Sequence, residues 1–265
     1  MVGTNAHSAR MQTATRKARA SYANARIVVS LRPAGDHAPM RRAAAAHGWR
    51  VVALSPWRIA TRDDADTLAA LSQALHAEVI VATSPAAVRA ARTHSALHAP
   101  HARAWCAVGT ATAAALRRAG IAHVHVPARM DSEGLLALDV LQDVHGRTVG
   151  VLTAPGGRDR IAPALRERGA RVVRADVYAR EPMAPNARAL AALRASPPGW
   201  LVPVSSAEAL ERTLAALPDD LGARLRAATV LAASERIATI ARTLGCTDIR
   251  VASGPRPAQL LAAAG

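Results

Sequence analysis

The chain contains a long internal repeat, in which the second half restates the first. Gly48-Trp49-Arg50 followed by two valines returns as Gly169-Ala170-Arg171 followed by two valines, an offset of 169 − 48 = 121 residues. After a short insertion the offset becomes 245 − 120 = 125, relating Gly120 to Gly245. Each copy is long enough to close a core of its own, unlike a solenoid unit. The sequence therefore predicts two similar lobes with a ligand cleft between them.

Each copy alternates short β-branched runs with alanine-rich helical stretches. In the first copy we expect strands over residues 26–30, 50–54, 78–82, 104–108 and 123–126. Strand, helix and strand joined by short turns indicate a parallel sheet with crossover helices. Each lobe is thus predicted to be a doubly wound α/β sheet. From the repeat alone, contiguous halves are the simplest division.

The composition narrows the class of protein without identifying a ligand. The chain has 265 residues, of which 51% are hydrophobic, enough for two cores. Its net charge of +15 attracts polyanions, either nucleic acid or a polycarboxylate. No apolar run approaches the length of a membrane span, and no signal-peptide core is present near the start, so a cytoplasmic protein that does not bind membranes is expected.

The amino-terminal residues and the cysteines and histidines give no sign of a folded segment or of a metal site. Residues 1–25 contain basic but no acidic side chains and lie outside the repeat, so we expect a disordered basic tail. Cys106 and Cys246 lack the spacing of metal ligands, and the histidine pairs find no suitable thiol partners. No metal site and no cofactor are therefore predicted.

Hydroxyl-bearing residues and glycines follow several predicted strands. In open α/β sheets ligands bind where strand carboxyl ends meet helix amino ends, and free backbone N–H groups there attract anions. Any one such turn is better explained by helix capping alone, but their recurrence at equivalent places in both copies indicates carboxylate-sized receptors. The turns concerned are Thr83-Ser84, Gly109-Thr110-Ala111-Thr112, Ser205-Ser206 and Ser234.

One aromatic position differs in kind between the two copies. Tyr178 is placed at the end of a predicted strand, at the joint between the lobes, and the equivalent residue of the first copy is Trp57. An aromatic ring at both places favours packing at a hinge. A phenol, unlike an indole, can also donate a proton to a leaving hydroxide. Packing and acid catalysis both remain open for Tyr178.

In their order and spacing these segments resemble the uroporphyrinogen-III synthase family over Arg26 to Ala263. No segment is specific alone. The resemblance is carried by Leu31-Arg32-Pro33, Thr83 to Val88, Val108 to Ala113, Asp131 to Leu135, Gly156-Gly157-Arg158 through Leu165, and Val177-Tyr178.

The resemblance implies a division different from contiguous halves. One lobe would comprise residues 26–57 plus 179–265 and the other residues 58–178, joined by a two-stranded connection. It also implies a cofactor-free lyase reaction of haem biosynthesis, in which hydroxymethylbilane loses water and closes to uroporphyrinogen III with its last ring inverted. Tyr178 would assist the departure of hydroxide. The candidate substrate-binding residues are Arg32, Thr83, Ser84, Gly109, Thr110, Thr112, Gly156, Gly157, Ser205, Ser206 and Ser234.

Alternatives from other functional classes share some of these features. A non-catalytic bilobed module that closes on a small anionic ligand would need the anion-binding turns but not Tyr178. A nucleic-acid binder would use the basic tail, but no helix carries an arginine stripe and the aromatic platforms for single strands are missing. We therefore expect a monomeric enzyme that binds no nucleic acid and receives its substrate from porphobilinogen deaminase.

Overall fold

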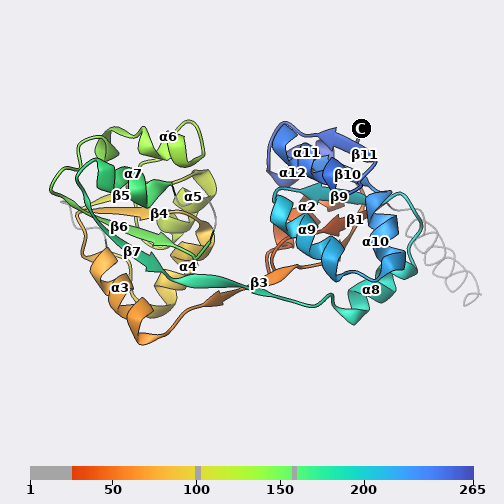
Figure 1. Ribbon diagram of the computed structural model, residues 1–265, viewed down its shortest axis with the longest axis horizontal. Helices are drawn as coiled ribbons and strands as arrows, with labels where there is room; N and C mark the ends of the chain where they lie inside the picture. Colours follow the sequence, from red (N-terminus) through yellow and green to blue (C-terminus); the bar gives the residue numbers. More distant parts are fainter. Residues whose placement is uncertain (1–25, 99–102, 157–159) are drawn as a thin grey trace, which may run out of the picture. The chain divides into compact units, whose positions relative to one another are not determined.

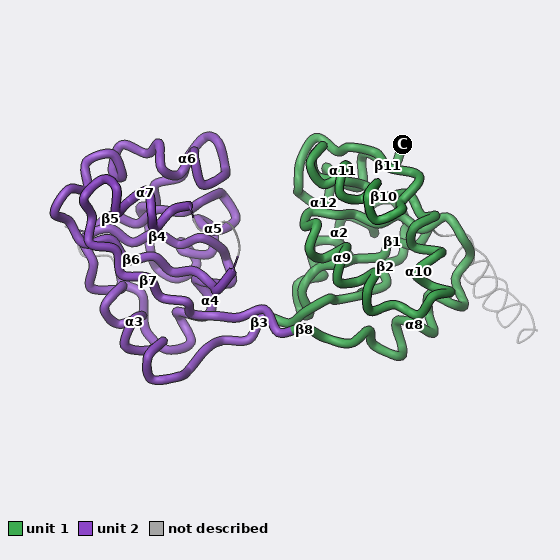
Figure 2. Tube along the Cα trace, in the orientation of Figure 1, with its two compact units in different colours: residues 1–58, 182–265 green, residues 59–181 purple. Residues whose placement is uncertain are grey.

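The computed structural model describes residues 26–98, 103–156 and 160–265 (Figure 1). The chain divides into two compact units (Figure 2). Unit 1 combines the residues up to Arg58 with Pro182–Gly265, and unit 2 is the uninterrupted segment Ile59–Glu181. Strands β3 (Trp57–Thr61) and β8 (Tyr178–Pro182) pair as a two-stranded sheet where the chain passes from one unit to the other and back. Unit 1 is therefore discontinuous in sequence.

Unit 2 is built on a parallel sheet of four strands in the order β5-β4-β6-β7. The crossover segments supply helices between these parallel strands, as the alternating sequence pattern requires. The strands are β4 (Val79–Ala82), β5 (Ala104–Ala107), β6 (Thr148–Thr153) and β7 (Arg171–Asp176). The helices are α3 (Ala65–Leu75), α4 (Pro85–His94), α5 (Thr110–Arg118), α6 (Ser132–Leu136), the 3-10 turn η1 (Asp139–Leu141) and α7 (Ile161–Glu167).

Both faces of the unit 2 sheet are covered. Side chains alternate along a strand, so Ile80 and Ala82 of β4 belong to one core while Val79 and Val81 belong to another. The first core also takes residues from α3, α4 and α5, and the second from α6, η1 and α7. This two-sided burial explains why the strands are continuous apolar runs rather than alternating ones.

Unit 1 holds a parallel sheet of five strands in the order β11-β10-β9-β1-β2. Buried residues of α2 and α12 pack on one face of it with Val28, Leu201 and Leu231. The strands are β1 (Ile27–Ser30), β2 (Arg50–Ala53), β9 (Leu201–Val204), β10 (Thr229–Ala232) and β11 (Asp248–Val251). The helices are α2 (Ala38–Ala45), α8 (Ala187–Arg194), α9 (Ala207–Ala216), α10 (Asp219–Arg226), α11 (Glu235–Thr243) and α12 (Pro257–Ala262).

The internal repeat appears as an equal strand register in the two units. Ile27 of β1 lies opposite Arg50 of β2, and Thr148 of β6 lies opposite Arg171 of β7. The offsets are 148 − 27 = 121 and 171 − 50 = 121. The prediction of two similar α/β units with parallel sheets is confirmed.

Two local expectations are wrong. The strand expected over residues 123–126 is reduced to an isolated bridge, in which His125 pairs with Cys106 of β5. Pro127 follows shortly after and cannot donate a ladder hydrogen bond, which limits pairing beyond the bridge. Tyr178, expected at the end of a strand, instead begins β8, because β7 already ends at Asp176. Within the described residues, no helix combines the length and apolar character needed to cross a membrane.

Candidate functional site

A pocket of about 220 Å³ lies in unit 2, beside the turns that follow β4 and β6. Tyr178 and Ser84, both predicted site residues, line it together, and Thr83 and Gly156 lie beside them. The same pocket takes two arginines, Arg174 from β7 and Arg180 from β8. The remaining lining residues are Val108, Ser132, Val151, Thr153, Ala154, Pro155 and Ile161.

The Tyr178 hydroxyl is fixed by Ser84. Tyr178 is only 5% exposed, and its Oη atom lies 3.1 Å from Ser84 Oγ. Ser84 is the N-cap of α4, and its Oγ atom accepts a hydrogen bond of 3.1 Å from the Ala87 N–H. Ser at the N-cap followed by Pro85 at the first helical position is the sequence signal that begins α4 here. The cap thus sets the position of the hydroxyl that meets Tyr178.

The other polar groups of this pocket are held by neighbouring strands. The Thr83 hydroxyl donates to Leu152 O at 3.2 Å and lies 3.0 Å from Thr153 Oγ1. Arg174 Nε donates to Asp176 Oδ1 at 3.0 Å, and its Nη2 donates to Ala154 O at 3.1 Å. These contacts fix the guanidinium at the wall of the pocket, where it is paired with the Asp176 carboxylate.

The predicted glycine turn after β5 lies outside the lining of this pocket. Gly109 is the N-cap of α5 and makes no side-chain cap, since it has none to make. Thr110 is exposed, with its Oγ1 atom 3.6 Å from Met130 Sδ, whereas Thr112 is buried in the face of α5 that packs on the sheet. No residue of the turn lines the pocket, but Val108, which comes directly before Gly109, does.

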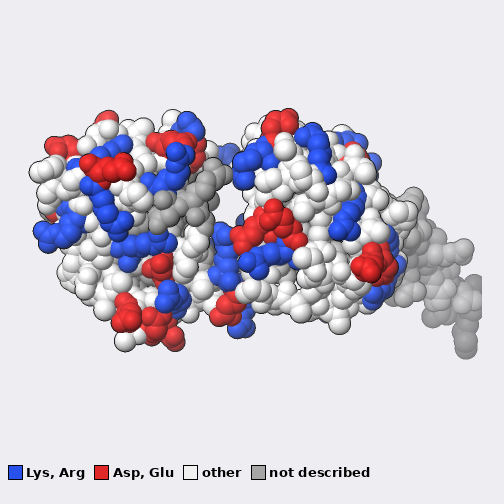
Figure 3. Space-filling model, viewed as in Figure 1, with Lys and Arg blue, Asp and Glu red and all other residues white. Residues whose placement is uncertain are grey.

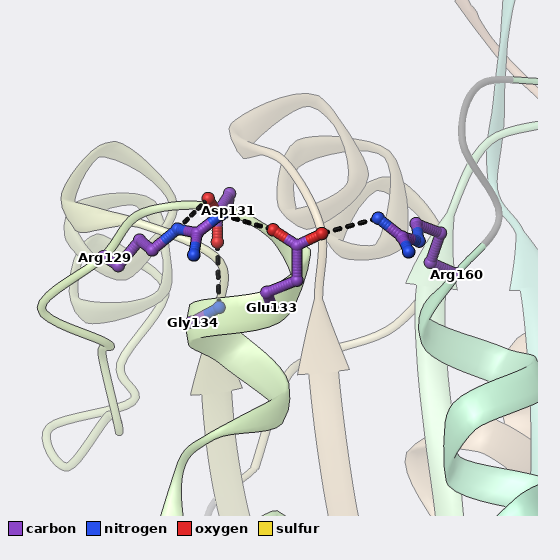
Figure 4. A network of polar contacts seen from close by, with 5 residues as sticks. All are labelled: Arg129, Asp131, Glu133, Gly134 and Arg160. Atoms are coloured by element: carbon purple, nitrogen blue, oxygen red, sulfur yellow. Dashed lines mark hydrogen bonds and ion pairs between the residues drawn. The ribbon is translucent and has the colours of Figure 1, made fainter.

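A network of charged side chains connects α6 and α7 (Figure 4). Asp131 caps α6 by accepting the Gly134 N–H at 2.8 Å, and Arg129 pairs with both Asp131 and Glu133. Glu133 also pairs with Arg160, at the N-cap of α7. The capping and Arg129 together hold the pKa of Asp131 below its ordinary value. The network joins the amino ends of α6 and α7, whose first residues, Ser132 and Ile161, line the pocket.

A second pocket, of about 180 Å³, lies in unit 1. It contains the predicted residues Arg32, Ser205 and Ser206. Arg32 forms an ion pair with Asp36 and donates from Nε to Asp36 O at 2.8 Å. Ser206 caps α9, with its Oγ atom 3.4 Å from the Ala209 N–H. The other lining residues are Leu31, Pro33, Met40, Trp57, Pro203, Val204, Ala209 and Leu260.

The two remaining predicted positions differ in their surroundings. Ser234 is the exposed N-cap of α11, makes no side-chain cap and is not among the lining residues of either pocket. Gly156 has a φ of +77°, which favours glycine, and lies at the unit 2 pocket. Gly157 lies outside the described residues.

Sequence reasoning missed Arg174, Arg180, Ser132 and Thr153. Arginines are abundant along this chain, and of these four positions only Ser132 belongs to a segment that carries the family resemblance, Asp131 to Leu135. Figure 3 shows basic side chains interspersed with acidic ones on the visible face, so charge alone does not mark the pocket. An available signal was the position of Arg180, two residues after Tyr178, because side chains two apart lie on the same side of a strand.

Among the described residues, the cysteines form no disulfide and the acidic groups form no cluster of metal-binding size. Both cysteines are free and buried, and burial raises the pKa of Cys106 to about 12. No group of three or more histidine, cysteine, aspartate and glutamate side chains in this part of the chain could hold a metal ion. The polar groups of the two pockets are hydroxyls, arginines and helix amino ends, which suit carboxylates, together with the carboxylate of Asp36, which is paired with Arg32 in unit 1.

Such features define an α/β protein of two units, each with a pocket that is lined by hydroxyl and arginine side chains. A family model described as uroporphyrinogen-III synthase HemD matches residues 38–262. The uroporphyrinogen-III synthase of Escherichia coli (strain K12) is 33% identical over 195 residues, covering 71% of this chain and 77% of that protein. The chain therefore belongs to the uroporphyrinogen-III synthase family, lyases of porphyrin biosynthesis.

Solved structures share the fold. The uroporphyrinogen-III synthetase of Helicobacter pylori 26695 has a TM-score of 0.59 at 14% identity, over 90% of this chain and 98% of that one. A mutant uroporphyrinogen III synthase from the extremely thermophilic bacterium Thermus thermophilus has a TM-score of 0.56 at 20% identity, over 90% of this chain and 96% of that one. At these identities the likeness concerns the fold alone.

Proposed function

We propose that this enzyme closes hydroxymethylbilane to uroporphyrinogen III, using Tyr178 in the unit 2 pocket to assist the departure of the substrate's hydroxyl group. Membership of the family supports the substrate, a linear tetrapyrrole bearing acetate and propionate groups. Loss of hydroxide leaves an azafulvene cation, which the substituted carbon of the terminal pyrrole attacks. The spiro intermediate then fragments and recloses with the last ring inverted.

The single observation that carries the role of Tyr178 is its contact with Ser84. Ser84 Oγ accepts from the Ala87 N–H, which leaves the Ser84 hydroxyl proton available for donation to Tyr178 Oη. Tyr178 can then give its own proton to the leaving hydroxide, while Ser84 stabilises the phenolate that forms.

The charged and hydroxyl groups of both pockets are proposed to hold the substrate's carboxylates. In unit 2 these groups are Arg174, Arg180 and the amino end of α4, and in unit 1 they are Arg32 and the amino end of α9. Arginine binds carboxylates through two parallel N–H donors, and a helix amino end adds unpaired backbone N–H groups. Gly109, Thr110, Thr112, Gly156, Gly157 and Ser234 stay candidate substrate contacts.

Positioning is the main contribution that this chemistry asks of the protein. The substrate carries both nucleophile and electrophile, so holding the flexible chain in one geometry can supply roughly 7–11 kcal/mol through effective molarity. The apolar walls of the unit 1 pocket, such as Met40, Trp57 and Leu260, suit pyrrole rings. We propose that no cofactor takes part, that the enzyme works as a cytoplasmic monomer and that porphobilinogen deaminase hands over the substrate.

The test is conversion of hydroxymethylbilane by the purified full-length chain without additives, with type III and type I products resolved after oxidation. We expect the type III isomer. Addition of a chelator should leave the rate unchanged. Formation of type I product alone, or activity that a chelator abolishes and a metal restores, would contradict the proposal.

A further inference from the structure

A buried histidine in unit 1 plays no part in the function proposed above. His37 is 7% exposed and lies at the start of α2. Its Nδ1 atom is 2.9 Å from Ser30 Oγ, at the end of β1, and its Nε2 atom is 2.8 Å from Ser55 Oγ, just after β2. Ser30 is fully buried. Both ring nitrogens therefore have hydroxyl partners, one at the end of β1 and one in the segment that follows the neighbouring strand β2.

This arrangement is not required for the start of the helix. His37 occupies the N-cap position of α2 but makes no side-chain cap, so the imidazole is used for the serines instead. Buried polar groups lower stability unless their hydrogen bonds are complete, and a neutral imidazole needs one donor and one acceptor. Serine hydroxyls can fill either role. A complete polar network of this kind fixes one local arrangement.

The two segments that His37 joins are walls of the unit 1 pocket. Arg32, Pro33 and Asp36 lie between Ser30 and His37, and Trp57 follows Ser55 by two residues; all four line that pocket. Backbone bonds support the same junction, since the Ala34 N–H donates to Trp57 O at 3.0 Å. The His37 side chain joins the carboxyl ends of β1 and β2 directly, through its contacts with Ser30 and Ser55.

We infer that His37 is a positioning residue, which holds the Arg32 loop and the Trp57 segment together so that the unit 1 pocket is formed before substrate binds. This inference rests on the proposed function, because the pocket is taken to receive part of the substrate. His37 does not line the pocket and has no direct contact to offer a ligand there. Its effect is therefore on the fraction of molecules whose pocket is ready for binding.

The charges near His37 favour its neutral form. Burial, together with Arg41 of α2 and Arg32, lowers its pKa, while Asp36 acts in the opposite direction. Protonation makes both ring nitrogens donors, so the hydroxyl that had donated to the ring must turn to another acceptor. Acid should therefore loosen the junction in the same way as loss of the side chain.

The kinetic consequence separates this role from catalysis. If only a fraction of molecules has the formed pocket, the apparent affinity for substrate falls by that fraction, while turnover of bound substrate is kept. Loss of a buried hydrogen-bond pair corresponds to roughly a fivefold to tenfold change in such an equilibrium. We expect His37→Gln to raise KM for hydroxymethylbilane by at most that factor, with little change in kcat.

The experiment uses the full chain with two matched histidine variants, one at each end of α2. His37→Gln tests the junction, and His47→Gln is the control, since His47 is exposed beyond the other end of α2 and stacks on Trp49. Ser55→Ala should raise KM like His37→Gln, and combining the two should add little, because they remove the same contact. Because the pKa of His37 is lowered, the wild-type KM should rise only as pH falls below about 6.5, and this rise should be absent in His37→Gln.

A second measurement does not depend on activity. Amide hydrogen exchange at Ala34 should become roughly tenfold faster in His37→Gln and stay unchanged in His47→Gln. An inactive wild-type protein would contradict the proposed function while leaving the exchange measurement to decide on His37. An unchanged KM or an unchanged exchange rate at Ala34 in His37→Gln would overturn the positioning role, whatever happens to the melting temperature.

Discussion

Tyr178 and Trp57 occupy the first position of the two connecting strands, β8 and β3, and are 178 − 57 = 121 residues apart. Both are buried, but only Tyr178 presents a hydroxyl to Ser84. Tyr178→Phe keeps the ring and removes the donor. We expect kcat to fall by about 10²–10⁴, the range for a general acid, with the fold retained. Steady-state assays with circular dichroism check both parts.

Trp57→Phe is the matched control for this prediction. It also keeps an aromatic ring at the start of a connecting strand, but it lines the unit 1 pocket and faces no proposed proton transfer. The rate should change much less than in Tyr178→Phe. Near-wild-type rates for both variants, with type III product retained, would reduce Tyr178 to packing and assign catalysis to substrate positioning alone.

His37 gives the stability of unit 1 a dependence on pH. Its pKa in the folded chain lies below the ordinary value of 6.5, so between these two values the unfolded chain binds more protons. The contribution of His37 to the free energy of unfolding is therefore complete above about pH 6.5. It falls as pH drops toward the folded pKa, by at most ~1.4 kcal/mol per pH unit. Urea titrations at several pH values measure this slope, which should be smaller in His37→Gln and unchanged in His47→Gln.

At the scale of elements, helix α3 lies directly against strand β6. A Cβ atom added at Gly150 of β6 would stand 2.2 Å from Ala74 O, a backbone atom of α3 that cannot turn aside. Gly150→Ala should therefore push helix and strand apart and lower the free energy of unfolding by roughly 1–3 kcal/mol or more. Thermal melting of the variant checks this.

Gly222 of α10 provides the opposite case. A Cβ atom there meets only Arg226 Nη1, at 3.4 Å, the far end of a flexible side chain. Alanine is the better helix former, so Gly222→Ala should stabilise the chain by roughly 0.5–1 kcal/mol. If the two alanine variants melted alike, close packing of α3 on β6 would not be the reason that position 150 is glycine.

Sequence reasoning succeeded for elements whose signals are local. The cap Ser84-Pro85 marked the start of α4, and the β-branched runs marked the paired strands of both sheets. The strand prediction over residues 123–126 failed because alternation of valine and histidine does not supply a partner strand. Only His125 pairs, with Cys106 of β5. The pocket arginines Arg174 and Arg180 could not be predicted, since they come together with Ser84 only through the fold.

The division into units was also beyond local signals. The repeat favoured contiguous halves, and only the family resemblance implied a discontinuous unit. A repeat states which segments are alike, but not which copies of a strand share a sheet. In the structure β1 pairs with β2, which is near it in sequence, and with β9, which is far from it. In the second pairing Val28 lies opposite Leu201. This long-range pairing depends on how the whole unit packs, so local sequence signals do not predict it.

For the whole molecule, the continuous segment Ile59–Glu181 is predicted to fold alone. It spans 181 − 59 + 1 = 123 residues, a usual domain size, and holds a complete sheet with a core on each face. The isolated fragment should show a single cooperative melt. It should not form uroporphyrinogen III, because the unit 1 pocket is absent. A fragment without cooperative melting would show that unit 2 depends on unit 1 for its stability.

The insertion of unit 2 within unit 1 also has a consequence during synthesis on the ribosome. Strands β1 and β2 emerge early, yet β9 begins only at Leu201, 201 − 53 = 148 residues after β2 ends at Ala53. At about 5–20 residues per second, the nascent β1 edge waits roughly 7–30 s for its partner. Unit 2 completes its own sheet within this interval. We therefore expect the unpaired edge of β1 to be open to wrong pairing while translation continues.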